Sequence, residues 1–117
     1  MDQRSPLAPD RFPALPAVPG VEISGLHVGL KPAKGAKDLM MARLARGTTI
    51  AGVFTQSKCP SAPVDWCRSV IGQGNARALI VNSGNANAFT GNAGDTVVSE
   101  TIRAAAKLLK GPQREVF

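Results

Sequence analysis

Residues 82–91, NSGNANAFTG, carry the side chains that suggest chemistry most directly. This segment consists mostly of small residues and contains the amides of Asn82, Asn85 and Asn87, with Phe89 as its one bulky side chain. Side-chain amides donate and accept hydrogen bonds, and small residues leave backbone N–H groups accessible, so the segment could line a site for a polar substrate. Alternatively, Asn85 and Asn87 could satisfy backbone groups within a tight turn, as asparagine commonly does.

The other reactive side chains form no recognisable catalytic motif. His27 has no carboxylate or cysteine beside it in the sequence, which favours a structural role. Ser57 and Lys58 are neighbours, and neighbours along a strand point to opposite faces, which argues against a serine–lysine pair. The carboxylates are dispersed, and the glycine spacing matches neither a dinucleotide-binding nor a phosphate-binding loop.

The two cysteines, Cys59 and Cys67, lie eight residues apart without the Cys-x-x-Cys spacing or histidines of a zinc site. We therefore expect free thiols in a reducing cytoplasm, and no metal site. The alternative, a disulfide, requires the two Cα atoms to lie within about 7 Å.

Two predicted elements flank residues 82–91. Residues 76–82 contain a continuous apolar run, which is typical of a central strand buried on both faces. After the segment, apolar residues recur at helical spacing and predict one buried helix face, formed by Val98, Ile102, Ala105 and Leu109. In such a strand–loop–helix unit the loop lies at the carboxyl edge of the sheet, where ligands often bind.

The predicted helix has candidate residues at both ends. Asn92, Asp95 or Thr96 could cap its first turn, because their side-chain oxygens can accept from unpaired helix amides. Gly111 and Pro112 are expected to end it.

Upstream, the pattern predicts strands joined by turns. Residues 21–30 alternate like a strand with an irregularity at Gly25, and residues 38–44 fit either a helix or, preferably, the partner strand of a hairpin. The β-branched residues of 48–55 predict a further strand, and residues 64–68 a short helix. Strands followed by a connector, a buried strand and a helix indicate an α/β layered domain.

Composition fits one domain with a short leader. The chain has 117 residues, 44% of them hydrophobic, and five of its nine prolines fall within residues 1–19, which predicts an extended arm. The apolar runs of the arm are too short for a membrane span or a signal peptide, so we expect neither membrane insertion nor export.

A net charge of +6 and a pI near 10.0 raise the question of nucleic-acid binding. However, the basic residues are scattered apart from Lys31, Lys34 and Lys37, and there are few aromatic side chains on which bases could stack. The sequence therefore argues against nucleic acid as a partner.

Residues 81–91, VNSGNANAFTG, resemble the signature segment of the ornithine acetyltransferase family. The similarity continues in order through most of residues 19–117. It includes residues 18–20 (VPG), 47–55 with the ending GVFT, 62–64 (APV) and 77–81.

This resemblance implies part of an αββα layered sandwich of the self-processing, N-terminal-nucleophile type. The family cleaves its own chain between an alanine and a threonine, and the freed threonine accepts an acetyl group from N-acetylornithine and passes it to glutamate. Some members also use acetyl-CoA, no metal or organic cofactor is required, and the two halves assemble as α2β2. Arginine biosynthesis in the bacterial cytoplasm is the implied setting.

The family's oxyanion-hole segment, Ser-Thr-Gly-Val-Ile-Gly, and its threonine nucleophile are expected after Phe117, so no catalytic residue is assigned to this chain. The expected division is an arm, residues 1–19, and an incomplete N-terminal portion of the acetyltransferase domain, residues 20–117. Alone, the chain is expected to be inactive and poorly stable. The candidate site-lining residues are Asn82, Gly84, Asn85 and Asn87.

Two alternatives belong to other functional classes. An aminopeptidase of the same self-processing fold would carry a serine nucleophile in place of threonine. A non-catalytic basic binding module would show salt-sensitive binding to generic DNA.

Overall fold

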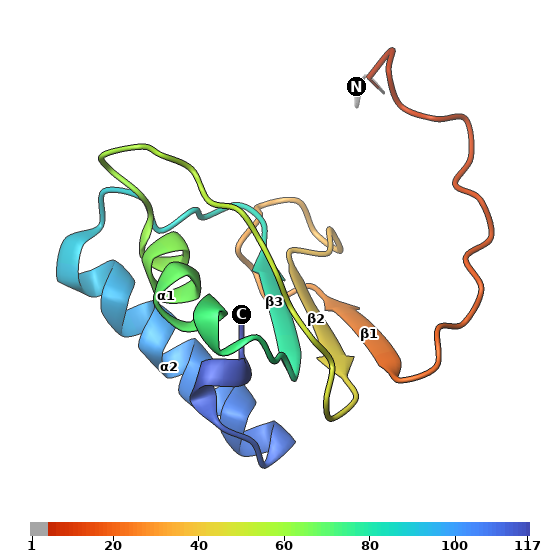
Figure 1. The fold of residues 1–117 in the computed structure, drawn as a ribbon. Helices are drawn as coiled ribbons and strands as arrows, with labels where there is room; N and C mark the ends of the chain where they lie inside the picture. The colour runs from red at the N-terminus through yellow and green to blue at the C-terminus, as the bar shows by residue number, and fades with distance from the viewer. Residues whose placement is uncertain (1–4) are drawn as a thin grey trace.

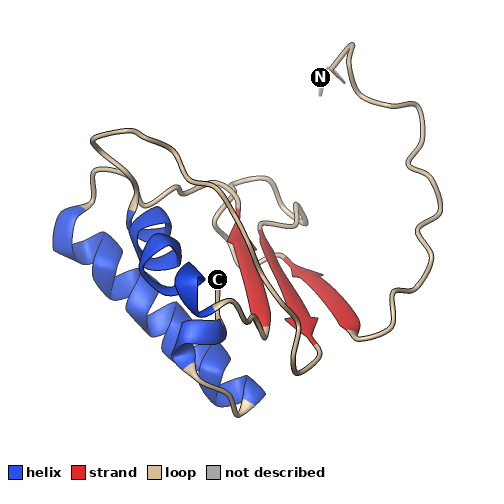
Figure 2. Ribbon diagram, in the orientation of Figure 1, coloured by secondary structure: helices blue, strands red, loops and turns tan. Residues whose placement is uncertain are grey.

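The computed structural model describes residues 5–117, which form a three-stranded sheet with helices on its β3 side (Figures 1 and 2). The strands are β1 (Val21–Leu26), β2 (Leu39–Leu44) and β3 (Ala78–Asn82). The α-helices are α1 (Ala62–Val70) and α2 (Gly91–Leu109), and the short 3-10 helices are η1 (Ile71–Gln73) and η2 (Gln113–Glu115).

The sheet is antiparallel with the order β1-β2-β3, so the predicted hairpin of the first two strands is confirmed. Gly25 pairs with Met40 within an unbroken ladder, so the predicted irregularity at Gly25 is wrong. The first strand also ends at Leu26 rather than residue 30, because the N–H of Val28 donates to the carboxylate of Asp38 instead of to a neighbouring strand.

β3 is the last strand in the sheet order, so the prediction of a central strand is wrong for these residues. One edge pairs with β2, and along the other the N–H of Phe117 donates to Ala78 at 2.9 Å in a parallel bridge. The prediction that both faces are buried is wrong, since Leu79 and Val81 are 41% and 46% exposed. They lie on the face of the sheet opposite to the helices.

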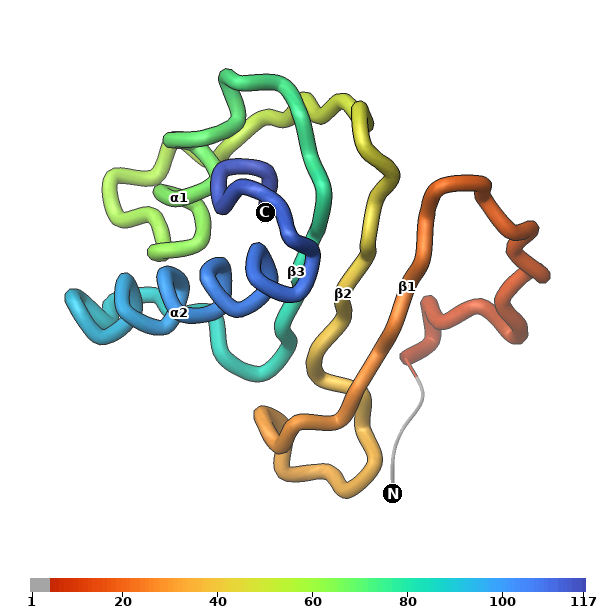
Figure 3. The backbone as a smooth tube through the Cα atoms, turned by 90° about the horizontal axis from the view of Figure 1, so that it is seen from below, coloured from red at the N-terminus to blue at the C-terminus, as the bar shows by residue number. Residues whose placement is uncertain are grey.

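The core lies between the sheet and the helices. Seen from below, α1, α2 and the C-terminal residues gather on the β3 side of the sheet (Figure 3). The predicted apolar face of α2 is confirmed, because Ile102 and Ala105 are buried while Val98 and Leu109 pack against them. Fully buried Val116 completes this cluster.

The predicted N-terminal caps of α2 are wrong. The helix begins at Gly91, and Asn92, Asp95 and Thr96 lie inside it. Thr90 occupies the cap position, but its hydroxyl donates to the carbonyl of Asn87 and caps no helix amide. The hydroxyl is thus engaged by a carbonyl three residues before it in the loop.

The chain between β2 and α1 contains the other clear difference from the sequence pattern. Residues 48–55 form no strand beyond a single bridge from Thr49 to Asn75, and Val53 is 99% exposed. β-Branched residues favour strands by packing on a neighbouring strand, and residues 50–55 have none here. The short helix predicted at residues 64–68 is confirmed within α1, with Pro63 in its first turn.

The described part of the arm, residues 5–19, runs outside the sheet and helices without regular structure (Figure 1). Leu7, Phe12 and Leu15 are at least 84% exposed along it. Within residues 5–117, neither helix carries an apolar stretch long enough to cross a bilayer.

Candidate functional site

The loop between β3 and α2 forms the candidate site. Two of its amides are used within the loop itself: the side chain of Asn82 donates to the backbone oxygen of Asn85, and Oδ1 of Asn85 accepts from the N–H of Asn87 at 3.0 Å. The turn-forming interpretation, made for Asn85 and Asn87, therefore holds for the side chain of Asn85, and Asn82 plays the same part.

Asn87 differs from the other two asparagines. It has a positive φ of 48° and is 8% exposed, and its backbone oxygen accepts from Ala62 N–H and from the Thr90 hydroxyl, at 3.4 and 3.1 Å. Among residues 5–117 its side-chain amide forms no hydrogen bond, and because no enclosed polar atom there lacks a partner, this amide is open to the adjoining space. Asn87 lines a cavity, so its whole amide is available to a ligand there, whereas Asn82 and Asn85 each use one amide atom within the loop.

That cavity has a volume of about 210 Å³ and lies between the helices and the sheet. Its walls are mainly apolar, with Trp66, Ile80, Val98 and Phe117 among them, while asparagines 82, 85 and 87 lie at the loop end. A hollow of this kind suits a ligand with a short apolar body and a polar head group.

Gly84 is required by the backbone rather than by a ligand. Its φ is +112°, and a Cβ there would lie 2.9 Å from the backbone oxygen of Leu30. The loop thus touches the β1–β2 connection closely, and Ser83 N–H donates to the backbone oxygen of Asp38 at 2.8 Å.

Asp38 is a positioning residue that the sequence patterns did not reveal. Its side chain is fully buried and accepts from the N–H groups of Val28 and Lys31, at 2.7 and 3.0 Å. Burial acts to raise the pKa of Asp38, but these N–H groups, that of Leu30 and the nearby His27 together lower it from 3.8 to about 2. The carboxylate therefore stays ionised and organises the connection on which the site loop rests.

His27 has the structural role that the sequence favoured. Its Nδ1 lies 2.7 Å from the backbone oxygen of Ala36 and 3.3 Å from Oδ2 of Asp38. The carboxylate partner is eleven residues away in the sequence, which is why inspection of its neighbours missed it.

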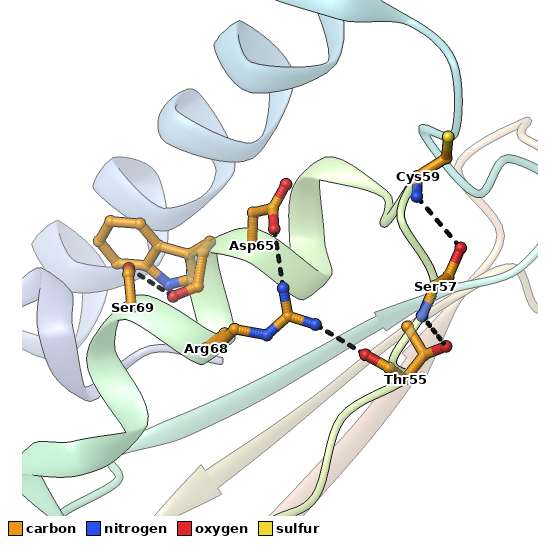
Figure 4. Close-up of polar contacts among 7 residues, drawn as sticks. Thr55, Ser57, Cys59, Asp65, Arg68 and Ser69 are labelled. Carbon is orange, nitrogen blue, oxygen red and sulfur yellow. Dashed lines mark hydrogen bonds and ion pairs between the residues drawn. The ribbon is translucent and has the colours of Figure 1, made fainter.

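Side-chain hydroxyls that accept from backbone N–H groups stabilise turns in the segment before α1 (Figure 4). Oγ1 of Thr55 accepts from the N–H of Ser57, Oγ of Ser57 accepts from the N–H of Cys59, and each distance is 3.2 Å. Arg68 of α1 donates to the backbone oxygen of Thr55 at 2.8 Å and to Asp65 at 3.3 Å. The hydroxyl of Ser57 therefore stabilises a turn.

Both cysteines are free thiols, and burial raises the pKa of Cys67. Within residues 5–117, no three His, Cys, Asp or Glu side chains come together as a metal site would require.

The chain is similar to curated bacterial proteins along nearly all of its length. It is 48% identical over 113 residues to the arginine biosynthesis bifunctional protein ArgJ of Bradyrhizobium diazoefficiens, and 50% identical over 113 residues to that of Brucella suis. Each alignment covers 97% of this chain and 27% of the relative. The chain thus spans about a quarter of the length of these relatives.

Two solved structures share its fold. An ornithine acetyltransferase from Mycobacterium tuberculosis, complexed with ornithine, is 36% identical with a TM-score of 0.72. The arginine biosynthesis bifunctional protein ArgJ from Bacillus halodurans is 34% identical with a TM-score of 0.74. Both matches cover 84% of this chain, and they cover 53% and 51% of those chains.

The sequence model of the ArgJ family matches residues 22–117, from β1 to the last residue. That range includes β3, the loop with its three asparagines, and α2. Because the match covers most of the chain, and the fold agrees with solved structures at more than 30% identity, the chain belongs to the ArgJ family.

Proposed function

We propose that residues 20–117 form the N-terminal portion of the α/β domain of an enzyme of bacterial arginine biosynthesis. The proposed reaction moves an acetyl group from N-acetylornithine to glutamate through an acyl-threonine intermediate. Membership of the ArgJ family carries this proposal, and the ornithine in the related structure from Mycobacterium tuberculosis supports the choice of substrate class. The threonine belongs to the part of the enzyme outside these 117 residues.

The open face of the sheet supports an αββα sandwich for the complete protein. Ile23, Leu79 and Val81 lie on the face opposite to the helices and are 70%, 41% and 46% exposed. Exposed apolar side chains on one sheet are covered in layered folds by a second sheet. In this proposal the rest of the precursor supplies that sheet, and processed halves assemble as α2β2.

Within this enzyme we assign the unpaired amide of Asn87 a place at the edge of the substrate site. Asn82, Gly84 and Asn85 would shape the loop, while the Asn87 amide would donate to or accept from a polar group of the substrate or of the neighbouring backbone. The amide lines the cavity, so it can reach a polar group bound there.

The first test is an intact-mass spectrum of the complete protein, followed by an assay of acetyl transfer from N-acetylornithine to glutamate. A companion chain that begins with threonine, together with transfer activity, supports the proposal. A chain that begins with serine and cleaves peptides would replace it with the aminopeptidase alternative.

Asn87→Gly tests the assigned residue, because glycine accepts the positive φ and removes the amide alone. A substrate hydrogen bond predicts that kcat/KM falls by about tenfold or more, while the thermal midpoint changes little. Asn92→Ala, on the exposed side of α2, is the control and should keep full activity. Unchanged acetyl transfer in both Asn87→Gly and Asn85→Ala would show that the loop does not contact the substrate.

A further inference from the structure

A second hollow, at the opposite end of β3 from the site loop, is lined by an arginine that forms no ion pair within residues 5–117. Arg77 precedes the first residue of β3, and its side chain lies at the junction of two shallow hollows of about 310 and 320 Å³. Five residues of strand, at roughly 3.3 Å each, separate it from the loop end of β3, so the hollow is distinct from the cavity beside Asn87.

The guanidinium of Arg77 has one hydrogen bond to protein. Arg77 is 9% exposed, and its Nε donates to the backbone oxygen of Leu44 at 3.2 Å. Within residues 5–117, no carboxylate forms an ion pair with it. No enclosed polar side-chain atom of residues 5–117 lacks a partner, so the guanidinium nitrogens without a protein partner are open to the hollow, where an anion from solution can reach them.

Two further cations border the first hollow. Arg46 and Lys110 are both exposed and form no ion pair within the part of the chain that the structure describes. Glu115 is the one carboxylate that lines it, so three cations against one anion leave two positive charges. By contrast, Arg43 in the second hollow is already paired with Glu22 at 3.3 Å.

Helix capping does not account for this cluster. Basic residues at the end of a helix often neutralise its last carbonyl groups. Here the backbone N–H of Lys110 bonds to the oxygens of Ala106 and Lys107, and that of Gly111 bonds to Ala106 at 3.0 Å. The end of α2 is thus capped by its own backbone, and the side chain of Lys110 remains available.

We propose that the hollow formed by Arg46, Arg77 and Lys110 binds a small, doubly charged oxyanion of the phosphate class. The free edge of the Arg77 guanidinium supplies parallel N–H donors that match two oxygens of such an anion, and two exposed cations complete the charge balance. This site is separate from acetyl transfer, so its test is independent of that proposal.

Calorimetric titration of the complete protein with inorganic phosphate, at constant ionic strength maintained with chloride, tests the site. Lys110→Gln and Arg46→Gln, two exposed positions, should each weaken phosphate binding by about tenfold, the loss expected for one charge-assisted hydrogen bond. Lys34→Gln removes an equally exposed charge near the opposite end of the sheet and should leave the Kd unchanged.

Arg77→Lys adds a variant that keeps the buried charge and loses the paired donors. It should also weaken phosphate binding while the protein stays folded, which circular dichroism can verify. Absence of phosphate binding by the unaltered protein would overturn the proposal. A carboxylate from another part of the protein that occupies the hollow would produce this result. Equal weakening in Lys34→Gln would overturn it too, since the attraction would then be general.

Discussion

Asp38 shows how one buried residue can organise the backbone beside the candidate site loop. Its carboxylate binds the N–H groups of Val28 and Lys31, and its backbone oxygen receives the N–H of Ser83 at the start of the site loop. Each of these bonds favours the ionised form or fixes the backbone beside it. The shape of the loop therefore depends on a side chain outside it.

The lowered pKa of Asp38 predicts a specific dependence of stability on pH. Because the folded-state pKa of about 2 lies below the ordinary 3.8, ionised Asp38 stabilises the fold above pH 3.8. This contribution is lost as the pH falls from about 4 to about 2. Thermal midpoints of the complete protein measured across this range should fall more steeply than those of Asp38→Asn. Asp95→Asn, at an exposed position of α2, should retain the steep fall, and a parallel curve for Asp38→Asn would contradict the assignment.

Gly94 provides a second residue-scale prediction. A Cβ at this position would lie 2.1 Å from Oγ1 of Thr90, whose hydroxyl holds the backbone oxygen of Asn87. Gly94→Ala should therefore destabilise the complete protein by about 1–3 kcal/mol, as overpacking does, although alanine favours helices. Denaturant unfolding measures the change.

Gly72→Ala is the matched control for this substitution, because a Cβ there meets nothing within 4 Å. Removing the obstructing hydroxyl in a Gly94→Ala, Thr90→Ala double variant should recover part of the loss. Equal stability of Gly94→Ala and Gly72→Ala would show that Thr90 moves away from the new methyl group without a loss of stability.

At the scale of elements, one side chain joins α1 to the C-terminal segment. The indole N–H of Trp66 donates to the backbone oxygen of buried Val116 at 2.9 Å, fifty residues away in the chain. Val116 and Phe117 run along the edge of β3 that faces away from β2. This hydrogen bond therefore fixes the position of α1 relative to the sheet.

Trp66→Phe should loosen this junction while it keeps most of the apolar contact. The carbonyl of Val116 would lose its partner in a buried position, at a cost of about 1–3 kcal/mol. Amide hydrogen exchange in α1 of the complete protein should accelerate by about tenfold. Ser69→Ala, which removes the exposed hydrogen bond from Ser69 to the backbone oxygen of Trp66, should leave the exchange unchanged. Equal exchange in both variants would show that packing alone positions α1.

At the scale of the whole molecule, the sheet is covered on one side. The helices bury one face, while Ile23, Leu79 and Val81 remain exposed on the other. Exposed apolar area of this kind promotes association in water. The 117 residues are therefore expected to depend on a covering layer for their stability.

This dependence can be measured on the isolated chain. Produced alone, it should bind a hydrophobic dye, associate and lack a sharp thermal transition, because its outer sheet face has nothing to pack against. Leu79→Thr with Val81→Thr should reduce association while preserving strand propensity. Leu108→Thr, which makes the same leucine-to-threonine change at an exposed position of α2, is the control. A cooperative transition in the unaltered chain would refute the expectation.

The sequence alone determined the elements whose patterns are local. The helical spacing of Val98, Ile102 and Ala105 identified α2, because one face of a helix must be apolar to pack on a sheet. The unusual composition of residues 81–91 identified the family, since few sequences share so long a run of small residues and asparagines.

Tertiary structure decided the features that depend on partners distant in the chain. The β-branched residues of 48–55 stayed irregular because residues 50–55 have no strand beside them. Likewise, the packing leaves the side-chain amide of Asn87 without a hydrogen bond and Arg77 without a carboxylate partner within residues 5–117. Sequence patterns report propensities along the chain, whereas the hydrogen-bond partner of a buried group is fixed when distant segments pack together.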